Sequence, residues 1–384
     1  MDNAGKILVA GGRGFIGGHL VAELLRRGNT DLRVVDCKPI SEWHQVFREI
    51  ENVRADLRKM DACRAVTRDA RYVFNLAADM GGMGFIESHK AECMLSVLIS
   101  THLLIAAREA SVERFFYSSS ACVYPTKKQT TAAVAPLRES DAYPAMPEDG
   151  YGWEKLFSER MCRHFREDYG LETRVARYHN VYGPAGTYDG GREKAPAAIC
   201  RKVIAAKFSG IDEIEIWGDG NQTRSFMYIS DCIIGTRLIF DSNEIEPLNL
   251  GSDRLVTINQ LVDIVEAIAG VKLKRIYNLA APKGVRGRNS DNTLIGERLG
   301  WKPSVSLERG LEPTYRWIHD QMVGESKGHR GGSRGDRGTG RSRREQNPGR
   351  RHGLSTRHAG FPVYQRSAKE PSWAQIIVNT VNVA

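Results

Sequence analysis

The chain has 384 residues, 41% of them hydrophobic, enough for a sizeable buried core and, by length, about two domains. Its longest apolar run, Cys93 to Ala107, is interrupted by Ser96, Ser100 and His102 and is shorter than the roughly 20 residues that a membrane helix needs. The seven cysteines are odd in number and scattered, without a Cys-x-x-Cys pair, which argues against a disulfide framework and a zinc site. We therefore expect a globular, cytoplasmic protein with reduced thiols, no membrane span and no metal.

The net charge of +9 arises in the C-terminal segment. From Lys327 onward the chain carries 12 of its 55 Lys and Arg residues and 3 of its 46 Asp and Glu residues, so the preceding part has 43 of each and is neutral. Residues 327–351 are mainly Gly, Arg and Ser, and such a composition buries too little apolar surface to offset chain entropy. We place a boundary near Gly324 and expect residues 325–384 to form a disordered basic tail.

The first predicted elements form a strand, a glycine-rich loop and a helix. A short apolar strand, Lys6–Ala10, leads directly into Gly11, Gly14 and Gly17, and apolar residues then recur at helical spacing. Glycines in this pattern allow the backbone to approach a pyrophosphate, and the helix N-terminus offers free N–H groups to it. The pattern predicts a dinucleotide-binding βαβ unit.

The second strand of this unit, residues 32–36, ends in Asp36. A carboxylate at this point can accept hydrogen bonds from the adenosine ribose, whereas it would repel the 2′-phosphate of NADP. Asp36 therefore favours NAD as the cofactor.

Strands and helices continue to alternate along the chain. Further strands are predicted at Tyr72–Leu76, Arg114–Tyr117 and Thr173–Ala176, with helices at 100–110 and 151–166 between them. This alternation predicts an α/β fold with a doubly wound parallel sheet, the Rossmann type.

Ligands of such sheets bind beyond the carboxyl ends of the strands, which makes loops 77–84, 118–124 and 177–183 candidates for the site. We expect an NAD-binding domain over residues 5–180. A smaller substrate domain is expected mainly over residues 181–324, with some segments returning to the first domain.

A catalytic group is predicted on the helix that begins near residue 151. Tyr151 and Lys155 are four residues apart, so they share one face of the helix, where an ammonium group favours the phenolate form of a nearby tyrosine. Ser119 and Ser120 stand at the end of a predicted strand, next to a candidate ligand loop. Together with the dinucleotide unit upstream, this pattern indicates catalysis by Tyr151, Lys155 and Ser120.

With these motifs the chain resembles the extended short-chain dehydrogenase/reductase superfamily, which pairs a Gly-x-x-Gly-x-x-Gly loop with a Ser and a Tyr-x-x-x-Lys helix. Three more segments are similar to superfamily motifs: Asn75–Ala78, Asn180–Pro184 and Gly218–Phe226. Members of the superfamily act on nucleotide sugars, and the resemblance implies such a substrate here.

Within the superfamily the chain most resembles the GDP-mannose 3,5-epimerases, over about residues 6–322. Sugar-nucleotide dehydratases of the superfamily place an Asp-Glu pair just after the catalytic Ser or Thr, where this chain has Ala121 and Cys122, so dehydration is disfavoured. Four segments carry the resemblance: Asp79–Phe85, Ser119–Pro125, Gly190–Ala198 and Gly284–Asn292.

The resemblance implies a role for each catalytic residue. Tyr151, its pKa lowered by Lys155 and the nicotinamide, takes the C4 hydroxyl proton while a hydride passes to NAD, and Ser120 orients the C4 oxygen. The resulting ketone acidifies C3 and C5, so that Cys122 can remove a proton from one face and Lys194 can return one from the other. Return of the hydride would complete the conversion of GDP-mannose to GDP-L-galactose.

The resemblance also implies the binding residues and a homodimer. Arg224 and Arg288 suit a diphosphate because guanidinium groups bind phosphate oxygens in pairs. The cofactor set is Gly11, Gly14, Phe15, Ile16, Gly17, Asp36, Asp56, Ala77, Tyr151 and Lys155. The substrate set is Gly81, Ser120, Ala121, Cys122, Asn180, Glu193, Lys194, Ala195, Lys202, Gln222, Thr223, Arg224 and Arg288.

Two other functions are compatible with the sequence. The protein could be another NAD-dependent nucleotide-sugar enzyme, a 4-epimerase or a reductase, although Cys122 and Lys194 favour the 3,5-epimerase. From a different class, the Arg/Gly tail could bind nucleic acid through phosphate contacts. The neutral body and the absence of interleaved aromatic residues between Lys327 and Leu354 disfavour that function. The base of the nucleotide, the exact sugar and the choice between C5-only and double inversion stay open.

Overall fold

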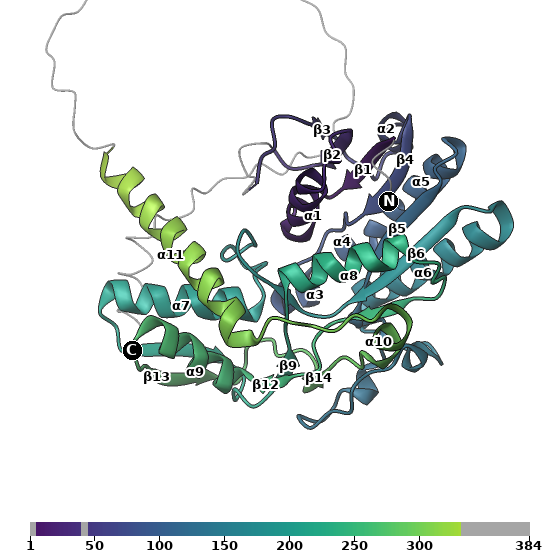
Figure 1. Cartoon of the computed structure of the whole chain (residues 1–384). Helices are drawn as coiled ribbons and strands as arrows, with labels where there is room; N and C mark the ends of the chain where they lie inside the picture. Colours follow the sequence, from purple (N-terminus) through teal and green to yellow (C-terminus); the bar gives the residue numbers. More distant parts are fainter. Residues whose placement is uncertain (1–4, 40–44, 332–384) are drawn as a thin grey trace, which may run out of the picture. The chain divides into compact units, whose positions relative to one another are not determined.

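The computed structural model describes residues 5–39 and 45–331 (Figure 1). By their contacts, the described residues belong to one compact unit, and residues 332–384 lie outside the described residues. The basic tail beyond Gly331, and with it the nucleic-acid hypothesis, therefore lies outside the described residues. Helix α11 (Leu307–Gly331) runs past Gly324, where the sequence suggested that the ordered part ends.

A parallel sheet forms the centre of the described unit. Within residues 5–39 and 45–331 it has seven strands, and every neighbouring pair in it is parallel. Across the sheet the order is β11 (Leu248–Leu250), β6 (Glu172–Tyr178), β5 (Arg114–Ser120), β4 (Ala70–Asn75), β1 (Lys6–Ala10), β2 (Leu32–Asp36) and β3 (Glu51–Arg54).

The chain starts in the middle of the sheet and builds outward in both directions. From β1 it passes through β2 to β3 at one edge, then crosses back to β4 and continues to the opposite edge. The switch point therefore lies between β1 and β4, where Val9 pairs with Val34 on one side and with Phe74 on the other. In doubly wound sheets the ligand crevice opens at the carboxyl ends of these strands.

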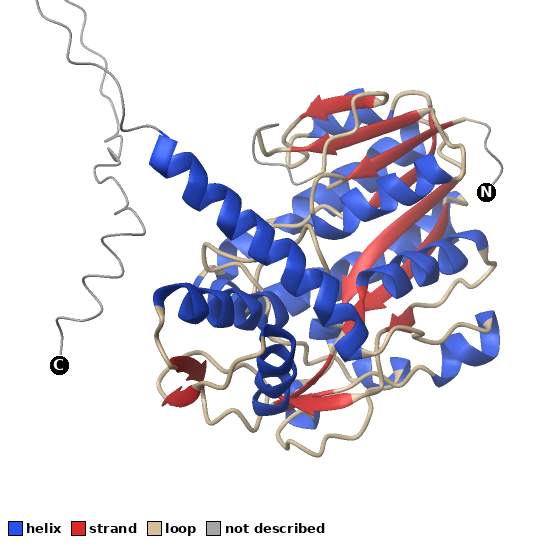
Figure 2. Cartoon of the chain, turned by 60° about the vertical axis from the view of Figure 1, so that its left-hand side comes forward, coloured by secondary structure: helices blue, strands red, loops and turns tan. Residues whose placement is uncertain are grey.

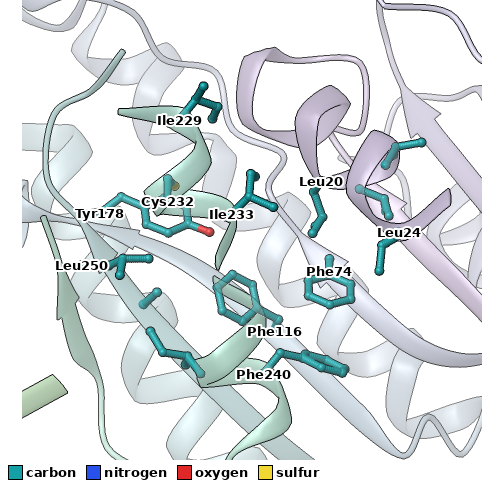
Figure 3. Close-up of a cluster of buried hydrophobic side chains, with 14 of the residues drawn as sticks. Leu20, Leu24, Phe74, Phe116, Tyr178, Ile229, Cys232, Ile233, Phe240 and Leu250 are labelled. Atoms are coloured by element: carbon teal, nitrogen blue, oxygen red, sulfur yellow. The ribbon is translucent and has the colours of Figure 1, made fainter. Parts of the chain in front are cut away.

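Helices cover both faces of the sheet, which explains why Ile7–Ala10 of the central strand β1 are apolar and buried without alternation. On one face, α1 (Phe15–Arg26) and α8 (Ile229–Asp241) bury a cluster that includes Leu20, Leu24 and Phe240 (Figure 3). On the other face, α2 (Met60–Thr67), α5 (Ser96–Glu109) and α6 (Asp149–Tyr169) bury a second cluster. The doubly wound α/β fold predicted from the sequence is confirmed.

One helical run among the described residues, Lys90–Glu109, is long and apolar enough to cross a membrane by length and composition. It consists of α4 (Lys90–Met94) and α5. In the structure, Leu103 and Leu104 on α5 are fully buried against the sheet. Core helices of folded domains meet the same criterion, so this run is weak evidence for a membrane span.

A smaller group of elements lies after β6 in the sequence. Helices α7 (Ala195–Ser209), α9 (Ile258–Ala269) and α11 lie next to one another (Figure 2), and they pack around a third apolar cluster. The described unit also has α3 (Met83–Ser88), α10 (Thr293–Leu299) and three small sheets: β7 (Val181–Tyr182) with β10 (Met227–Tyr228); β8 (Glu213–Trp217) with β13 (Lys274–Asn278); and β9 (Thr223–Ser225) between β12 (Leu255–Thr257) and β14 (Gly287–Arg288).

The predicted strands and helices agree with the structure within a few residues. Strands 6–10 and 32–36 have the predicted bounds, whereas β5 extends beyond its predicted end to Ser120. The sequence analysis did not identify β3 or β11. Strand β11 and helix α8 follow residue 181 yet belong to the large sheet and its cover, and the domain bounds 5–180 and 181–324 stay a prediction.

Replacing Phe240 by Ala tests the importance of the α8 contact. Phe240 is fully buried and stacks on Phe74 with ring centroids 4.3 Å apart. The truncation should lower the free energy of unfolding by about 3–5 kcal/mol, because it removes apolar burial and leaves a cavity. Urea unfolding followed by circular dichroism measures this change. Phe208→Ala, at a side chain that is 49% exposed, is the control and should cost less than about 1 kcal/mol.

Candidate active site

The glycine loop forms a close cradle at the carboxyl end of β1. Gly11 has a φ of +73°, and a Cβ atom there would lie 2.8 Å from the backbone of Ala77. At Gly17 a Cβ atom would lie 2.2 Å from the carbonyl oxygen of Gly11, so only glycine permits this approach. Gly14 is the residue that caps the N-terminus of helix α1, and it has no side chain that could bind the first N–H groups of the helix. These groups stay available to a phosphate.

A cavity of about 880 Å³ extends from this cradle across the ends of the strands. Asp36, at the carboxyl end of β2, lines it, as expected for a residue that contacts an adenosine ribose. Gly81, Ser120 and Lys194 of the predicted substrate set also line it. All ten residues of the predicted cofactor set line this cavity: Gly11, Gly14, Phe15, Ile16, Gly17, Asp36, Asp56, Ala77, Tyr151 and Lys155.

Ser120, Cys122 and Tyr151 meet where β5 faces the first turn of α6. Ser120 ends β5 and accepts a hydrogen bond of 3.2 Å from the backbone N–H of Cys122, in a short 3₁₀ turn over Ala121–Val123. Ser120 also hydrogen-bonds Tyr151, and Cys122 packs with Tyr151 in one buried cluster. Burial raises the pKa of Tyr151 well above its ordinary value, and Cys122 and Glu154 act in the same direction. An added positive charge is therefore needed to form the phenolate near neutral pH.

Lys155 is almost fully buried beside this tyrosine, with its Nζ atom 5.4 Å from the centre of the Tyr151 ring. The structure places a second charge there that the sequence analysis missed. Glu154 is also buried, and its Oε2 atom lies 3.5 Å from the Lys155 Nζ atom, while Oε1 accepts a hydrogen bond from Tyr117. Part of the lysine charge is thus balanced by Glu154, which leaves less of it to stabilise a phenolate.

Lys194 precedes α7 and lines the same cavity as Ser120 and Tyr151. Burial lowers its pKa, Arg288 lowers it further, and the Cys122 thiol acts in the opposite direction. The thiol and the amine therefore influence each other electrostatically, and their role as a proton-transferring pair stays a prediction. A lysine with a lowered pKa can lose and regain a proton more readily than an exposed one.

Arg288, on β14, connects Cys122 to a residue absent from the predicted set. Its Nη1 atom lies 3.5 Å from Cys122 Sγ, and its Nη2 atom donates a 2.6 Å hydrogen bond to Glu148 Oε2. Burial would raise the pKa of Glu148, but Arg288 and the Cys122 thiol keep it below its ordinary value. Glu148 stands three residues before Tyr151, and only this spacing could have drawn attention to it in the sequence.

Cys122, Arg288 and the other predicted substrate residues are not among the residues that line the cavity. Arg224 is partly buried and donates to the backbone oxygens of Thr223, Lys283 and Val285. Ala121 packs in a small apolar cluster. Asn180 donates to Ser225, Glu193 pairs with Arg201, Ala195 begins α7, Lys202 pairs with Glu215, Gln222 donates to the Trp217 carbonyl and Thr223 donates to the Ala132 carbonyl.

His179 lines the cavity, and its hydrogen bonds and burial determine its protonation state. The amide nitrogen of Asn249 donates to the carbonyls of Leu137 and Asp291, so its oxygen must accept the hydrogen bond from His179 Nε2 at 3.2 Å. Burial lowers the pKa of His179 to about 3. The ring is therefore neutral, and its Nδ1 atom is an acceptor without a hydrogen-bond partner in the described part of the chain.

Two of the segments that carried the resemblance are joined at the mouth of the cavity. The N–H of Gly82 donates to the carbonyl of Arg192, whose guanidinium donates to Asp79 and lies 3.6 Å from the centre of the Phe85 ring. A Cβ atom at Gly82 would lie 2.4 Å from the Glu193 carbonyl oxygen, so this contact requires glycine. The loop after β4 thus holds the segment that presents Lys194.

The fold and this site define a nucleotide-dependent enzyme in which Tyr and Lys act next to a dinucleotide cradle. Residues 7–251 match the family model described as the NAD dependent epimerase/dehydratase family, and the chain belongs to this family. The protein is an NAD-dependent enzyme, and the residues that line the cavity fit this cofactor.

Curated relatives indicate which members of the family the chain resembles. The chain is 46% identical to GDP-mannose 3,5-epimerase 1 of Oryza sativa subsp. indica, over 83% of this chain and 83% of the relative. It is 45% identical to GDP-mannose 3,5-epimerase of Arabidopsis thaliana, over 83% of this chain and 84% of the relative. Among solved structures, it resembles UDP-glucose 4-epimerase of Thermotoga maritima with UDP-glucose, with a TM-score of 0.74, 28% identity and coverage of 83% and 99% of the two chains.

Replacing Asp36 by Ser tests the cofactor cradle. The loss of hydrogen bonds to a charged acceptor should weaken NAD binding by roughly tenfold or more. NADP binding should improve relative to NAD, because the negative charge that would repel a 2′-phosphate is removed. Titration of protein fluorescence with each cofactor measures both effects. Asp61→Ser, at a side chain that is 100% exposed, should leave both affinities unchanged, and an unaltered preference in Asp36→Ser would contradict the assignment.

Proposed function

We propose that the protein is a nucleotide-sugar epimerase that converts GDP-mannose to GDP-L-galactose. The observation that supports this proposal most directly is that Cys122 packs against Tyr151, while Lys194 lines the cavity with Ser120 and Tyr151 and is coupled electrostatically to Cys122. A reductase or a simple 4-epimerase needs only the tyrosine, the lysine and a nicotinamide, whereas inversion at C3 or C5 needs two further proton-transferring groups. The 46% identity to a GDP-mannose 3,5-epimerase supports the same substrate.

The reaction begins with oxidation, because the C–H bonds at C3 and C5 are not acidic while C4 carries a hydroxyl. Bound NAD supplies a hydride acceptor for C4 and a positive charge that favours the phenolate of Tyr151. Tyr151 removes the C4 hydroxyl proton, and Ser120, which hydrogen-bonds this tyrosine, holds the C4 oxygen. The ammonium group of Lys155 lies beside the Tyr151 ring, where its positive charge favours the phenolate.

The resulting ketone makes the neighbouring carbons acidic, and the two remaining groups exchange protons with them. Cys122 in its thiolate form removes a proton from one face of the ring, which gives an enolate, and the ammonium of Lys194 protonates the opposite face. After inversion at C5, the Cys122 thiol loses a proton to solvent and the neutral Lys194 amine gains one, which restores the pair for inversion at C3. Tyr151 then returns the proton to the C4 oxygen as C4 regains its hydride from the bound cofactor. Arg288 lies beside Cys122 and suits the oxygens of the sugar or the diphosphate.

Incubation with GDP-mannose in heavy water tests this function. Deuterium should enter C5 and C3, because both protons pass through groups that exchange with solvent, and NMR of the sugar detects it. Cys122→Ser should slow this exchange by about 10²–10⁴-fold and leave NAD binding intact. As a matched control, Cys200→Ser replaces a buried cysteine of α7 and should retain exchange. Failure of every GDP-hexose to exchange would overturn the proposal.

We further propose that the enzyme is a homodimer that pairs through α5 and α6. Four large apolar side chains are exposed near there, Met94 at the end of α4, Leu98 on α5, and Trp153 and Phe157 on α6, with exposures of 37–50%. Trp153 and Phe157 are spaced by four residues, so they lie on one face of α6. Met94 lies against Gly150, which places the end of α4 next to the start of α6. A contiguous apolar surface of this kind supports association between copies.

Replacing Phe157 by Glu tests the dimer. A charge in the centre of an apolar interface should dissociate the protein into monomers, because the carboxylate would have to be buried without a partner. Size-exclusion chromatography with light scattering gives the mass directly. Phe208→Glu, at an equally exposed phenylalanine on α7, should stay dimeric. A monomeric wild-type protein at micromolar concentration would contradict the proposal.

A cytoplasmic location is also part of the proposal. All seven cysteines are unpaired, and six of them are buried. Free thiols on this scale are typical of a reducing compartment.

A further inference from the structure

The guanidinium of Arg288 is fixed by three different partners. Its Nε atom donates to Gln129 Oε1 at 2.6 Å, its Nη2 atom to Glu148 Oε2 at 2.6 Å, and its Nη1 atom to Cys122 Sγ at 3.5 Å. The side chain is 5% exposed. Because the guanidinium group is planar and rigid, the bonds to Gln129 and Glu148 determine where its third nitrogen meets the sulfur.

Glu148 contacts Cys122 in two further ways. It is the residue just before α6, and its backbone N–H donates to the carbonyl oxygen of Cys122 at 2.8 Å. Its carboxylate also accepts a hydrogen bond from the thiol. With 7% of its surface exposed, Glu148 has little solvent to screen its charge. One buried carboxylate therefore holds both the thiol and the guanidinium beside it.

The other charged and titratable groups around the thiol are mostly basic. Arg224 from β9 and Lys194 from the segment before α7 both interact electrostatically with Cys122. Tyr151 from α6 is coupled to the thiol as well, and Ser120 binds its backbone. Without a carboxylate, three cationic side chains would face this sulfur. Such a surrounding would convert the thiol into a stable thiolate, which is a weak base.

We propose that Glu148 sets how tightly Cys122 holds its proton, by fixing the Arg288 guanidinium beside the sulfur and offsetting its charge. Glu148 is a positioning residue in this role and does not touch the reacting carbon. The surroundings of Cys122 agree with this role of Glu148. Burial and Glu148 together raise the pKa of Cys122 to about 11, whereas Arg288 acts in the opposite direction.

The proposal rests on the proposed epimerase function, in which Cys122 removes a proton from carbon. A thiolate of high proton affinity removes a proton from a weakly acidic carbon faster than one of low affinity, but a smaller fraction of the thiol is ionised at a given pH, so its proton affinity must be set by its surroundings. An arginine beside the sulfur is useful for holding the substrate, but its unbalanced charge would weaken that base. By offsetting this charge, Glu148 allows Arg288 to lie beside the sulfur without lowering the proton affinity of the thiolate.

The test is a titration of Cys122 in the full-length NAD-bound enzyme without sugar. Thiolate absorbance in the ultraviolet is followed against pH, and the contribution of Cys122 is the difference between each protein and its Cys122→Ser counterpart. In Glu148→Gln the midpoint should fall by about one to three pH units, the range expected when a neighbouring charge is removed. Glu148→Asp retains the charge and should retain most of the midpoint. Glu266→Gln, at a buried glutamate of α9 that pairs with Lys272, should leave it unchanged.

Activity supplies the second measurement. The acid limb of the pH profile for kcat should shift to lower pH in Glu148→Gln in step with the thiol midpoint, and the rate on the plateau should fall because the base is weaker. If Glu148→Gln does not fold, Arg288→Gln is titrated instead and should raise the midpoint. A midpoint unmoved in the folded Glu148→Gln variant, or moved equally by Glu266→Gln, would overturn the proposal. The titration uses no sugar, so its outcome is independent of whether GDP-mannose undergoes exchange.

Discussion

The active site depends on the contact between the carbonyl oxygen of Cys122 and the first turn of α6. The N–H of Glu148 donates to it, and Gly152, one turn further along α6, lies so close that a Cβ atom would come within 2.3 Å of the same oxygen. The first turn of α6 is therefore docked on the turn that follows β5. Tyr151 and Lys155 come from the helix, and Ser120 and Cys122 from the strand and its turn. This single junction places all four side chains relative to one another.

Several charged side chains are buried next to this junction. Arg288 with Glu148, and Lys155 with Glu154, are buried ion pairs beside the catalytic groups. Removing one partner of such a pair typically costs about 3–5 kcal/mol, whereas replacing both by apolar groups can be neutral. Stability alone therefore does not require these pairs. In a water-poor site their electrostatic effect on nearby protons is large, which is the property that proton transfer uses.

Local patterns in the sequence predicted the strands and the glycine loop of the cofactor cradle. Strands 6–10 and 32–36 are short, mainly apolar and bounded by glycine or an acid, and the structure gives them the same bounds. The glycines of the cradle are neighbours in the chain, whereas the more distant members of the cofactor set, which line the same cavity, came from the family resemblance. The family resemblance supplied Cys122 and Lys194, which no local pattern would have distinguished from a buried thiol and a surface lysine.

The missed features depend on contacts between distant parts of the chain. Arg288 and Glu148 are 140 residues apart, and neither their spacing nor their surroundings in the sequence indicates a pair. Glu154 sits beside a lysine on a helix, a pattern that is typical of a solvated face, and only burial of that face makes it a counter-ion. Strand β11 has three residues, and it joins the sheet through pairing with β6 rather than through a strong pattern of its own.

The same surroundings shift the proton affinities of the two exchanging groups in opposite directions. In water a lysine holds its proton more tightly than a cysteine. Here burial and Glu148 raise the pKa of Cys122 to about 11, while burial and Arg288 lower that of Lys194. Both shifts favour the net transfer that an inversion requires, from the Lys194 ammonium to carbon and from carbon to the Cys122 sulfur. Each inversion leaves a thiol and a neutral amine, so the thiol must lose a proton to solvent and the amine must gain one before a second carbon can be inverted.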